Sequence, residues 1–253
     1  MKNTFFKEKK RDGSLKKNLI SLFYAIIAAL LIRSFLYEPF SIPSGSMYPN
    51  LKVGDYLFVS KFSYGFSKHS LPFSIPIIPG RLFSKEPERG EIVVFKTPED
   101  NRTDYIKRVV GLPGDLLEMK DNILIINNKE ISVTKKNVEK YKSFNVSKIM
   151  ETLPNKLTYE VYEFEKAIEG LNTNNFNKIK IPIDHFFVLG DNRDNSQDSR
   201  FIGLIPRENL VGRAEVVAVS FDTEIGSFLK FWTWYPALRK DRFFVSLVPK
   251  KKE

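Results

Sequence analysis

The chain of 253 residues carries 40 Lys and Arg against 30 Asp and Glu, which gives a formal net charge of +10 at pH 7. Its apolar fraction of 42% and charged fraction of 28% exclude a largely disordered chain. Cysteine is absent, which excludes disulfides, thiolate metal sites and a cysteine nucleophile, and two histidines, His69 and His185, are too few for a multi-histidine metal site. We therefore expect neither a metal nor another cofactor.

The positive charge is concentrated at the N-terminus. Residues 1–18 hold seven basic and two acidic side chains, a net charge of +5 and half of the excess of the whole chain. No stripe of basic and aromatic residues recurs later in the chain, so we do not expect nucleic acid as a partner.

A long apolar segment follows this basic tail. Residues 19–36 would form a helix about 27 Å long at 1.5 Å per residue, close to the ~30 Å thickness of a bilayer's hydrocarbon core, with Arg33 near its far end. A cleaved signal peptide would need small residues at a cleavage site, and residues 34–40 are mostly bulky. A buried core helix is the other alternative, which an all-round apolar stretch next to a tail of charge +5 disfavours. We predict one transmembrane helix over 19–36, with residues 1–18 in the cytoplasm by the positive-inside rule and the remainder on the other side.

Beyond residue 37 the apolar runs are short, rich in β-branched and aromatic residues, and bounded by Gly and Pro, which is typical of strands. Between residues 116 and 180 the composition shifts toward Asn, Lys and Glu. We predict a mainly β protein: an antiparallel β domain over 37–115 and 181–248, with a smaller α+β subdomain inserted over 116–180. The predicted strands are 56–59, 91–95, 105–110, 123–126, 186–189 and 214–220.

Two apolar segments do not fit central strands. Residues 62–83 contain three prolines, a density that a central strand or helix does not tolerate, and residues 231–235 read Phe-Trp-Thr-Trp-Tyr. Each segment is either packed on the domain or rests on the bilayer, where Trp and Tyr are favoured at the interface.

The first of three segments with functional residues follows the helix directly. Ser44-Gly45-Ser46-Met47 lies between Pro43 and Pro49, so the backbone forms a fixed, non-helical bend that presents a hydroxyl group. A simple serine-rich turn is the alternative. The Gly-x-Ser-x-Gly elbow of α/β-hydrolases is absent.

The second segment is Asp104–Asp115. In a strand, Tyr105, Lys107 and Val109 share one face, which places a lysine between apolar neighbours. Burial there disfavours the ammonium ion and lowers the lysine pKa from about 10.4, so that the amine could act as a base. A lysine facing solvent on an edge strand is the alternative.

The third segment is Gly190–Gly203, dense in Asp, Asn, Arg and Ser. It is not an EF-hand, because Arg193, Ser196 and Ile202 occupy positions that need an oxygen ligand, a glycine and a glutamate. The composition instead favours a hydrogen-bonded loop that supports a site. Arg193 or Arg200 could form a bidentate ion pair with one of three carboxylates, those of Asp191, Asp194 and Asp198.

Together the three segments resemble the bacterial type I signal peptidase (leader peptidase) family. The motifs that carry the resemblance are Ser44-Gly-Ser-Met-x-Pro49, Tyr105-Ile-Lys-Arg-x-x-Gly-x-Pro-Gly-Asp115 and Gly190-Asp-Asn-Arg-Asp-Asn-Ser-x-Asp-Ser-Arg200. They occur in the family's order, and Glu38-Pro-Phe40 and Arg89-Gly-Glu-Ile-Val-Val-Phe95 extend the match. The resemblance covers roughly residues 33–120 and 181–220; residues 121–180 match in role only.

The resemblance implies a membrane-bound serine endopeptidase with a catalytic β domain, which removes signal peptides from exported preproteins by cleaving after Ala-x-Ala. Ser46 would be the nucleophile and Lys107 the general base. Ser44 would contribute to the oxyanion hole, Ser196 would hydrogen-bond the lysine amine, and Asp198 and Arg200 would form a supporting ion pair. By analogy with the family, the substrate pockets would be lined by Phe40, Ile42, Met47, Leu51, Tyr105 and Ile106.

The expected partners are signal-peptide-bearing preproteins and the lipid bilayer, close to the protein translocase. The expected location is the cytoplasmic (inner) membrane, crossed once, with the catalytic domain on the periplasmic side. A related self-cleaving repressor would need an N-terminal DNA-binding domain, for which residues 1–37 are too short and too apolar. An inactive membrane-anchored scaffold is a second alternative; the presence of Ser46, Lys107 and Ser196 disfavours it.

Overall fold

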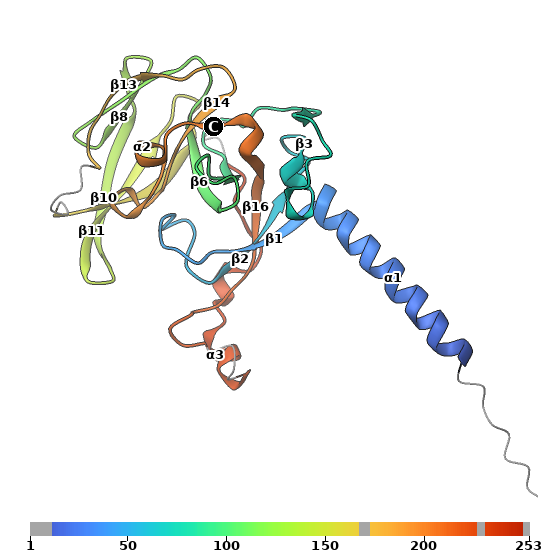
Figure 1. Cartoon of the computed structure of the whole chain (residues 1–253). Coiled ribbons are helices and arrows are strands. Elements are labelled where there is room, and N and C mark those ends of the chain that lie inside the picture. Colours follow the sequence, from blue (N-terminus) through green and yellow to red (C-terminus); the bar gives the residue numbers. More distant parts are fainter. Residues whose placement is uncertain (1–11, 167–172, 227–230, 250–253) are drawn as a thin grey trace, which may run out of the picture.

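One long helix extends from a β-rich body (Figure 1). The computed structural model describes residues 12–166, 173–226 and 231–249. In it, α1 (Asp12–Phe35) contains a stretch, Leu15–Phe35, that is long and apolar enough to cross a membrane, about 32 Å at 1.5 Å per residue. Only 6% of its most apolar window is buried, whereas a core helix would be mostly buried. The predicted N-terminal apolar helix is confirmed; residues 1–11 of the predicted tail lie outside the described residues.

The β body is built on a curled antiparallel sheet, which has eight strands among the described residues. Seven of them follow the spatial order β1-β2-β16-β5-β6-β14-β15, and the eighth, β17, pairs with β16. The strands are β1 (Tyr37–Ser41), β2 (Asp55–Ser60), β5 (Ile92–Lys96), β6 (Asp104–Gly111), β14 (His185–Leu189), β15 (Ile205–Pro206), β16 (Leu210–Ser220) and β17 (Val245–Ser246). The prediction of a mainly β, antiparallel fold is confirmed.

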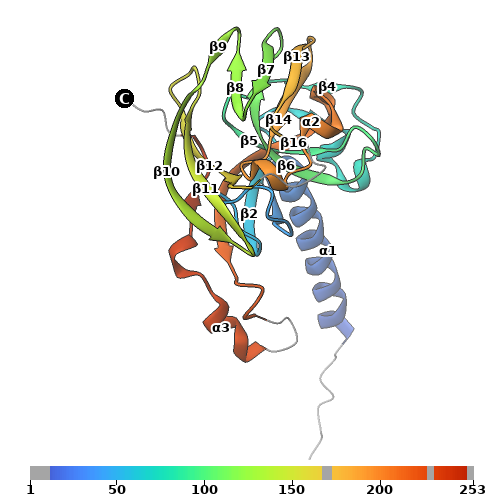
Figure 2. The same cartoon turned by 90° about the vertical axis from the view of Figure 1, so that its left-hand side faces the viewer.

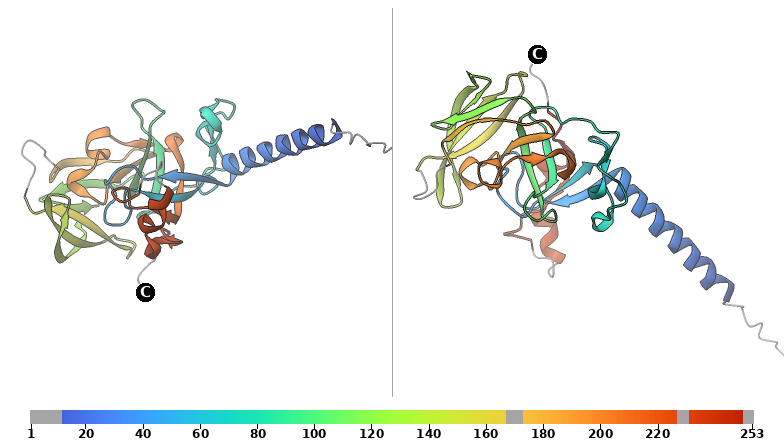
Figure 3. Two further views of the ribbon diagram at one scale, coloured as in Figure 1. Left: turned by 90° about the horizontal axis from the view of Figure 1, so that it is seen from below. Right: turned by 45° about the horizontal axis from the view of Figure 1, so that its top comes forward.

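The stretch 116–180 forms two smaller sheets, which lie at the opposite end of the molecule from α1 (Figures 1 and 3). One has the order β13-β7-β8-β9 and the other β10-β11-β12. Their strands are β7 (Leu116–Lys120), β8 (Ile123–Ile126), β9 (Lys129–Glu130), β10 (Ser132–Tyr141), β11 (Phe144–Thr152), β12 (Thr158–Phe164) and β13 (Phe176–Lys180).

The α component expected for this insert is not found in its described part, residues 116–166 and 173–180. The long hairpin of β10 and β11 explains the difference. Many of its exposed residues are charged or amide-bearing, but Val, Thr, Ile and Tyr are interspersed along both strands, and these residues favour extended backbone.

The two apolar segments without central strands lie at the edges of the body. Residues 62–83 contain β3 (Phe66–Ser67), the 3₁₀ turns η1 (Lys68–Ser70) and η2 (Pro72–Ser74), and β4 (Arg81–Leu82). The C-terminal segment with η5 (Phe231–Thr233), α3 (Trp234–Ala237) and η6 (Lys240–Arg242) leaves the body on the side toward which α1 also runs (Figures 1 and 2). Trp232 and Tyr235 are exposed there.

The core lies on both faces of β6. Val109 packs with Val93, Phe95 and Phe186 in one cluster, whereas Val110 packs with residues of the insert in another. Because both faces are covered, the second half of this strand is buried at consecutive positions rather than at alternate ones. Lys107 and Arg108 therefore enter the protein interior although both are charged residue types.

Candidate active site

Ser46 lies in a tight turn immediately after β1. Pro43 and Pro49 bracket this turn and keep the chain out of a helix. The carbonyl oxygens of Gly45 and Ser46 accept hydrogen bonds at 3.0 Å from the side-chain amide and the backbone N–H of Asn192, respectively. The turn is thereby attached to the loop around Asn192, which follows Ser46 by 146 residues in the chain.

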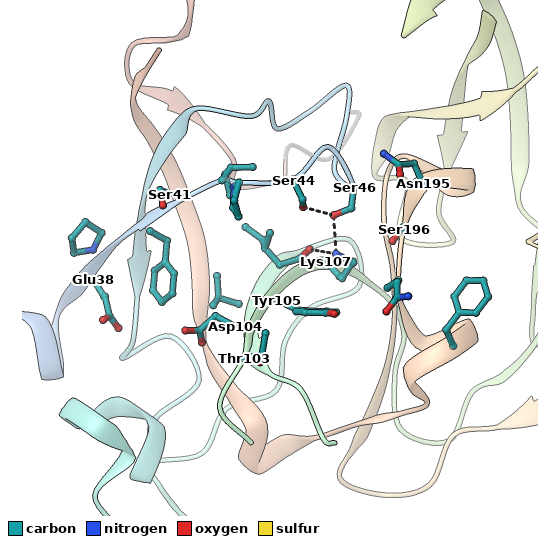
Figure 4. A pocket seen from close by; sticks show the side chains of 18 of the residues that line it. Glu38, Ser41, Ser44, Ser46, Thr103, Asp104, Tyr105, Lys107, Asn195 and Ser196 are labelled. Atoms are coloured by element: carbon teal, nitrogen blue, oxygen red, sulfur yellow. Dashed lines mark hydrogen bonds between the residues drawn. The ribbon is translucent and has the colours of Figure 1, made fainter. Parts of the chain in front are cut away.

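Lys107 reaches Ser46 from β6. Its Nζ lies 2.8 Å from Ser46 Oγ and 2.9 Å from the carbonyl oxygen of Ile106 (Figure 4). The lysine is 4% exposed and the serine 7% exposed, so the contact is largely shielded from water. The hydroxyl of Ser44 lies 3.4 Å from Ser46 Oγ on the other side.

Burial lowers the pKa of Lys107 from its ordinary value of 10.5 to about 8. The cause is the loss of hydration of the ammonium ion, which Asp198 and Asp191 oppose through their negative charge. The amine can therefore be neutral at mildly alkaline pH. A neutral amine with a free lone pair can accept the proton of a serine hydroxyl, which an ammonium ion cannot do.

The loop after β14 lies against the hydrogen-bonded pair of Ser46 and Lys107, called the dyad below, and is organised by Asp198. Its carboxylate pairs with Arg200 through two contacts of 2.8 Å and also accepts the backbone N–H of Gly190 at 2.9 Å. Arg200 in turn donates to the carbonyl oxygens of Thr173 and Arg193. This ion pair holds the loop in one conformation around α2 (Ser199–Ile202), of which Asp198 is the N-cap.

The expected hydrogen bond between Ser196 and the Lys107 amine is not formed. Lys107 Nζ already donates to Ser46 and Ile106, and Ser196 Oγ is buried without a hydrogen-bond partner in the described part of the chain. Ser196 nevertheless lines the same cleft as the dyad (Figure 4).

Gly190 is the point of closest approach between the loop and the Ser46 turn. A Cβ at this position would lie 2.1 Å from Ser196 Oγ and 2.6 Å from the Ser46 carbonyl oxygen. Such distances are far below van der Waals contact. Only a residue without a side chain allows the two segments to meet here.

A cleft of about 890 Å³ extends from the dyad to the end of α1. Four of the six predicted pocket residues line it, namely Phe40, Ile42, Tyr105 and Ile106. Met47 and Leu51 do not: both are completely buried in the core below the turn, so the expectation that they line the pocket is not met. The lining also contains residues that the sequence analysis did not single out, among them Val94, Thr103, Asp104, Asn195 and Phe201.

Two buried ion pairs beside the site were not assigned from the sequence. Arg108 forms a bidentate pair with Asp191 at 2.8 and 2.7 Å, and Arg193 pairs with Glu151 of the insert. Tyr141, also from the insert, places its hydroxyl against Gly45, where a Cβ would lie 1.9 Å from it. The insert therefore contacts the Ser46 turn directly.

Among the described residues, no group of three His, Asp or Glu side chains is arranged to hold a metal ion. The groups next to Ser46 Oγ are the buried amine of Lys107 and the hydroxyl of Ser44. This set is suited to acyl transfer through a serine.

Comparison with known proteins gives consistent results. Residues 15–219 match the family described as signal peptidase, peptidase S26. Signal peptidase I of Rickettsia typhi is 40% identical, with 94% of this chain and 96% of that protein covered, and the enzyme of Rickettsia felis is 40% identical, with 93% and 94% covered. A crystal structure of a signal peptidase I from Enterococcus faecalis is 28% identical, covering 51% of this chain and 97% of that one with a TM-score of 0.32.

The family match spans most of the chain and the relatives are aligned almost from end to end. These two findings do not depend on the geometry of the cleft. They indicate peptide hydrolysis by a serine, which is the reaction class that the buried serine and lysine also suggest. The chain belongs to the signal peptidase family S26, a family of serine peptidases.

Proposed function

We propose that this protein removes signal peptides from exported preproteins by cleaving after Ala-x-Ala, with Ser46 as nucleophile and Lys107 as general base. The observation that carries the proposal is the 2.8 Å contact between Ser46 Oγ and a buried lysine amine inside a cleft that extends to the end of a membrane-length helix. Family membership supports the reaction class.

The reaction begins when neutral Lys107 takes the Ser46 proton as Oγ attacks the scissile carbonyl carbon. The resulting ammonium ion returns the proton to the leaving amine as the C–N bond breaks, and an acyl ester remains on Ser46. A water molecule, deprotonated by the same amine, then attacks the ester, and the ammonium ion returns that proton to Ser46 Oγ as the C–O bond breaks. The backbone N–H of Ser46 and the Ser44 hydroxyl donate to the oxyanion; no backbone carbonyl in the described part of the chain accepts from that N–H.

Ser196 and the Asp198–Arg200 pair act through Lys107 and the loop. Asp198 fixes the backbone of Gly190, which packs against the Ser46 turn, and its charge raises the lysine pKa from the low value that burial alone would give. The Ser196 hydroxyl, buried and without a hydrogen-bond partner among the described residues, would accept a hydrogen bond from the amine after it moves away from acylated Ser46.

Two strand edges that pair with no other described strand are suited to bind an extended substrate. Among the described strands, β1 pairs only with β2, so its other edge is free. The first half of β6, residues 104–107, pairs with β5 on one side. Its other side is free there, because the pairing of β14 with β6 begins only at Arg108. A peptide between these edges would form main-chain hydrogen bonds on both sides. Its alternate side chains would then share one face, which fits Ala-x-Ala above the apolar surface formed by Phe40, Ile42 and Ile106.

The same proposal places the N-terminus in the cytoplasm and the catalytic domain on the periplasmic side of the inner membrane, near the translocase. The excess of basic residues before α1 supports this orientation through the positive-inside rule. A preprotein emerging there would still have its apolar segment in the bilayer, close to the cleft.

The test of the function is cleavage of a preprotein with one Ala-x-Ala site by the detergent-purified full chain. We expect a single cut after the second alanine, located by mass spectrometry, and none when that alanine is replaced by Phe, because a large side chain does not fit a shallow pocket. The absence of any cut by a folded protein that binds the preprotein would favour the inactive scaffold.

A second prediction concerns Gly190. We expect Gly190→Ala to lower kcat by about 10²-fold, the effect of displacing a reacting group by about 1 Å, because the added Cβ separates Ser196 from the Ser46 turn. Gly80→Ala is the control: its Cβ would meet nothing within 4 Å, so it should cost about 1–2 kcal/mol of stability at most, for its positive φ, and leave kcat unchanged. Equal kcat values for the two variants would contradict the packing argument.

A further inference from the structure

The junction between α1 and the β body is short and ordered. A single residue, Leu36, separates the helix from β1. Its N–H donates to Ile32 as the last helical hydrogen bond, at 2.8 Å, and its carbonyl oxygen accepts the N–H of Lys61 at 3.0 Å. The helix therefore passes into the sheet without a flexible linker.

Three charged side chains join this junction. Glu38 of β1 accepts from Arg33 of α1 at 2.6–2.7 Å through one carboxylate oxygen and from Lys61 at 2.7 Å through the other. Lys61 is 3% exposed and also donates to the carbonyl oxygen of Ser70 at 2.9 Å. Removing one partner of a buried ion pair is costly, so the Glu38–Lys61 pair holds β1 against residue 61. Arg33, whose side chain is 60% exposed, adds a weaker contact from α1 to the same carboxylate.

Aromatic contacts act on the same elements. Phe35 packs edge-on against Phe66 with ring centroids 5.3 Å apart, and Tyr37 packs against Phe62 at 5.5 Å. Both partners belong to the segment 61–70 that supplies Lys61. A helix that served only as a tether would need none of these contacts, whereas a helix held at a fixed angle to the sheet needs several.

The cleft connects this junction to the dyad. Arg33, Glu38, Ser44 and Ser46 all line it, and Figure 4 shows Glu38 and Ser46 well apart along the row of lining side chains, with Asn195 and Ser196 beyond Ser46. The five residues of β1 span about 17 Å at roughly 3.3 Å per residue. An extended peptide beside β1 would use about five residues to cover the same length.

We propose that the Arg33–Glu38–Lys61 cluster sets the number of residues between the apolar segment of the substrate and the bond that is cut. This inference rests on the proposed function. With α1 fixed relative to β1, Ser46 stays at one height above the bilayer, and only a scissile bond at the matching distance from the membrane reaches it. If the junction could bend, the dyad would reach bonds at several heights.

The experiment uses one preprotein with two identical Ala-x-Ala sites, about five and about nine residues beyond its apolar segment, and the full chain reconstituted in phospholipid vesicles. The wild type should cut the nearer site at least about tenfold more often. In Lys61→Met this ratio should fall about tenfold, which corresponds to about 1.4 kcal/mol of lost discrimination. Since both products come from one substrate molecule, their ratio does not depend on how much of the variant is folded.

The matched control is Arg207→Met, which removes a cation that pairs with Glu86 and Asp184 away from the junction. It should keep the wild-type ratio. Lys61 is not among the described residues that line the cleft, so Lys61→Met removes no side chain from its lining. An unchanged ratio in Lys61→Met, or equal use of the two sites by the wild type, would overturn the inference and leave the proposed function intact. If the wild type cuts neither site, the proposed function fails, and the inference fails with it.

Discussion

Replacing Lys107 by methionine is expected to lower kcat/KM for an Ala-x-Ala preprotein by about 10⁴-fold, the upper range for the loss of a positioned general base. Methionine has a similar length and no proton-accepting nitrogen. Without the amine 2.8 Å away, Ser46 Oγ has no other base within hydrogen-bond distance among the described residues, its remaining neighbour being the Ser44 hydroxyl. The measurement is the rate of appearance of the mature product.

The same experiment separates a catalytic loss from a folding defect. Because burial disfavours the Lys107 ammonium ion, the methionine variant should unfold at no lower temperature than the wild type at pH 7. Lys148→Met, which alters a lysine paired with Glu139 and Glu160 in the insert, should keep wild-type activity.

Ser46→Ala should match the loss in Lys107→Met, and the double variant should lose nothing further, because groups that act as a unit are not additive. A methionine variant with more than a tenth of wild-type activity would contradict the assignment of Lys107 as the base.

The sequence predicts the elements of this fold well where the physical signal is local. The apolar run before residue 36 has no polar face, which only a membrane or a complete protein shell can accommodate, and α1 is exposed in the structure. Short β-branched runs bounded by Gly and Pro become β2, β5, β6, β8, β14 and β16. The insert was harder to assign, since charged and amide-bearing residues in β10 and β11 weaken the alternating pattern on which strand prediction depends.

The chemistry-bearing residues could be named from motifs, but most of their partners could not. Arg193 illustrates the limit: the nearby carboxylates of its own loop were the natural candidates, whereas its partner is Glu151, 42 residues away in the insert. Asp191 likewise pairs with Arg108, 83 residues away. Pairing over such distances is set by how the sheets are arranged, which local sequence does not encode.

Met47 and Leu51 show a different limit. The family resemblance suggested that both face the substrate. The turn that presents Ser46 to the cleft points these two neighbours inward, where they fill the core with Leu57 and Val59. A tight turn directs successive side chains to different sides, and the register of that turn depends on its tertiary contacts, here those with Asn192.

The activity should fall steeply in acid. If neutral Lys107 is the base, kcat under single-turnover conditions should follow the fraction of that amine that is unprotonated. Its pKa is lowered by burial to about 8, so the neutral fraction is about one half at pH 8, about one tenth at pH 7 and about 1% at pH 6. The sign follows from the role: a general base works only when deprotonated, so activity is gained as the pH rises through the pKa. A flat profile between pH 5 and pH 8 would exclude an amine base.

Asp198 provides an independent check on the origin of this pH dependence. Its negative charge favours the ammonium form of Lys107 and raises the lysine pKa against the effect of burial. Asp198→Asn should therefore move the acid limb of the profile to lower pH, even though the loss of the Arg200 ion pair destabilises the loop. The midpoint of a pH profile does not depend on the amount of folded enzyme, so the shift remains measurable in a destabilised variant. Asp222→Asn, which removes a carboxylate paired with Arg239 elsewhere, should leave the midpoint unchanged. A midpoint that stays fixed in Asp198→Asn would mean that a group other than Lys107 controls the rate.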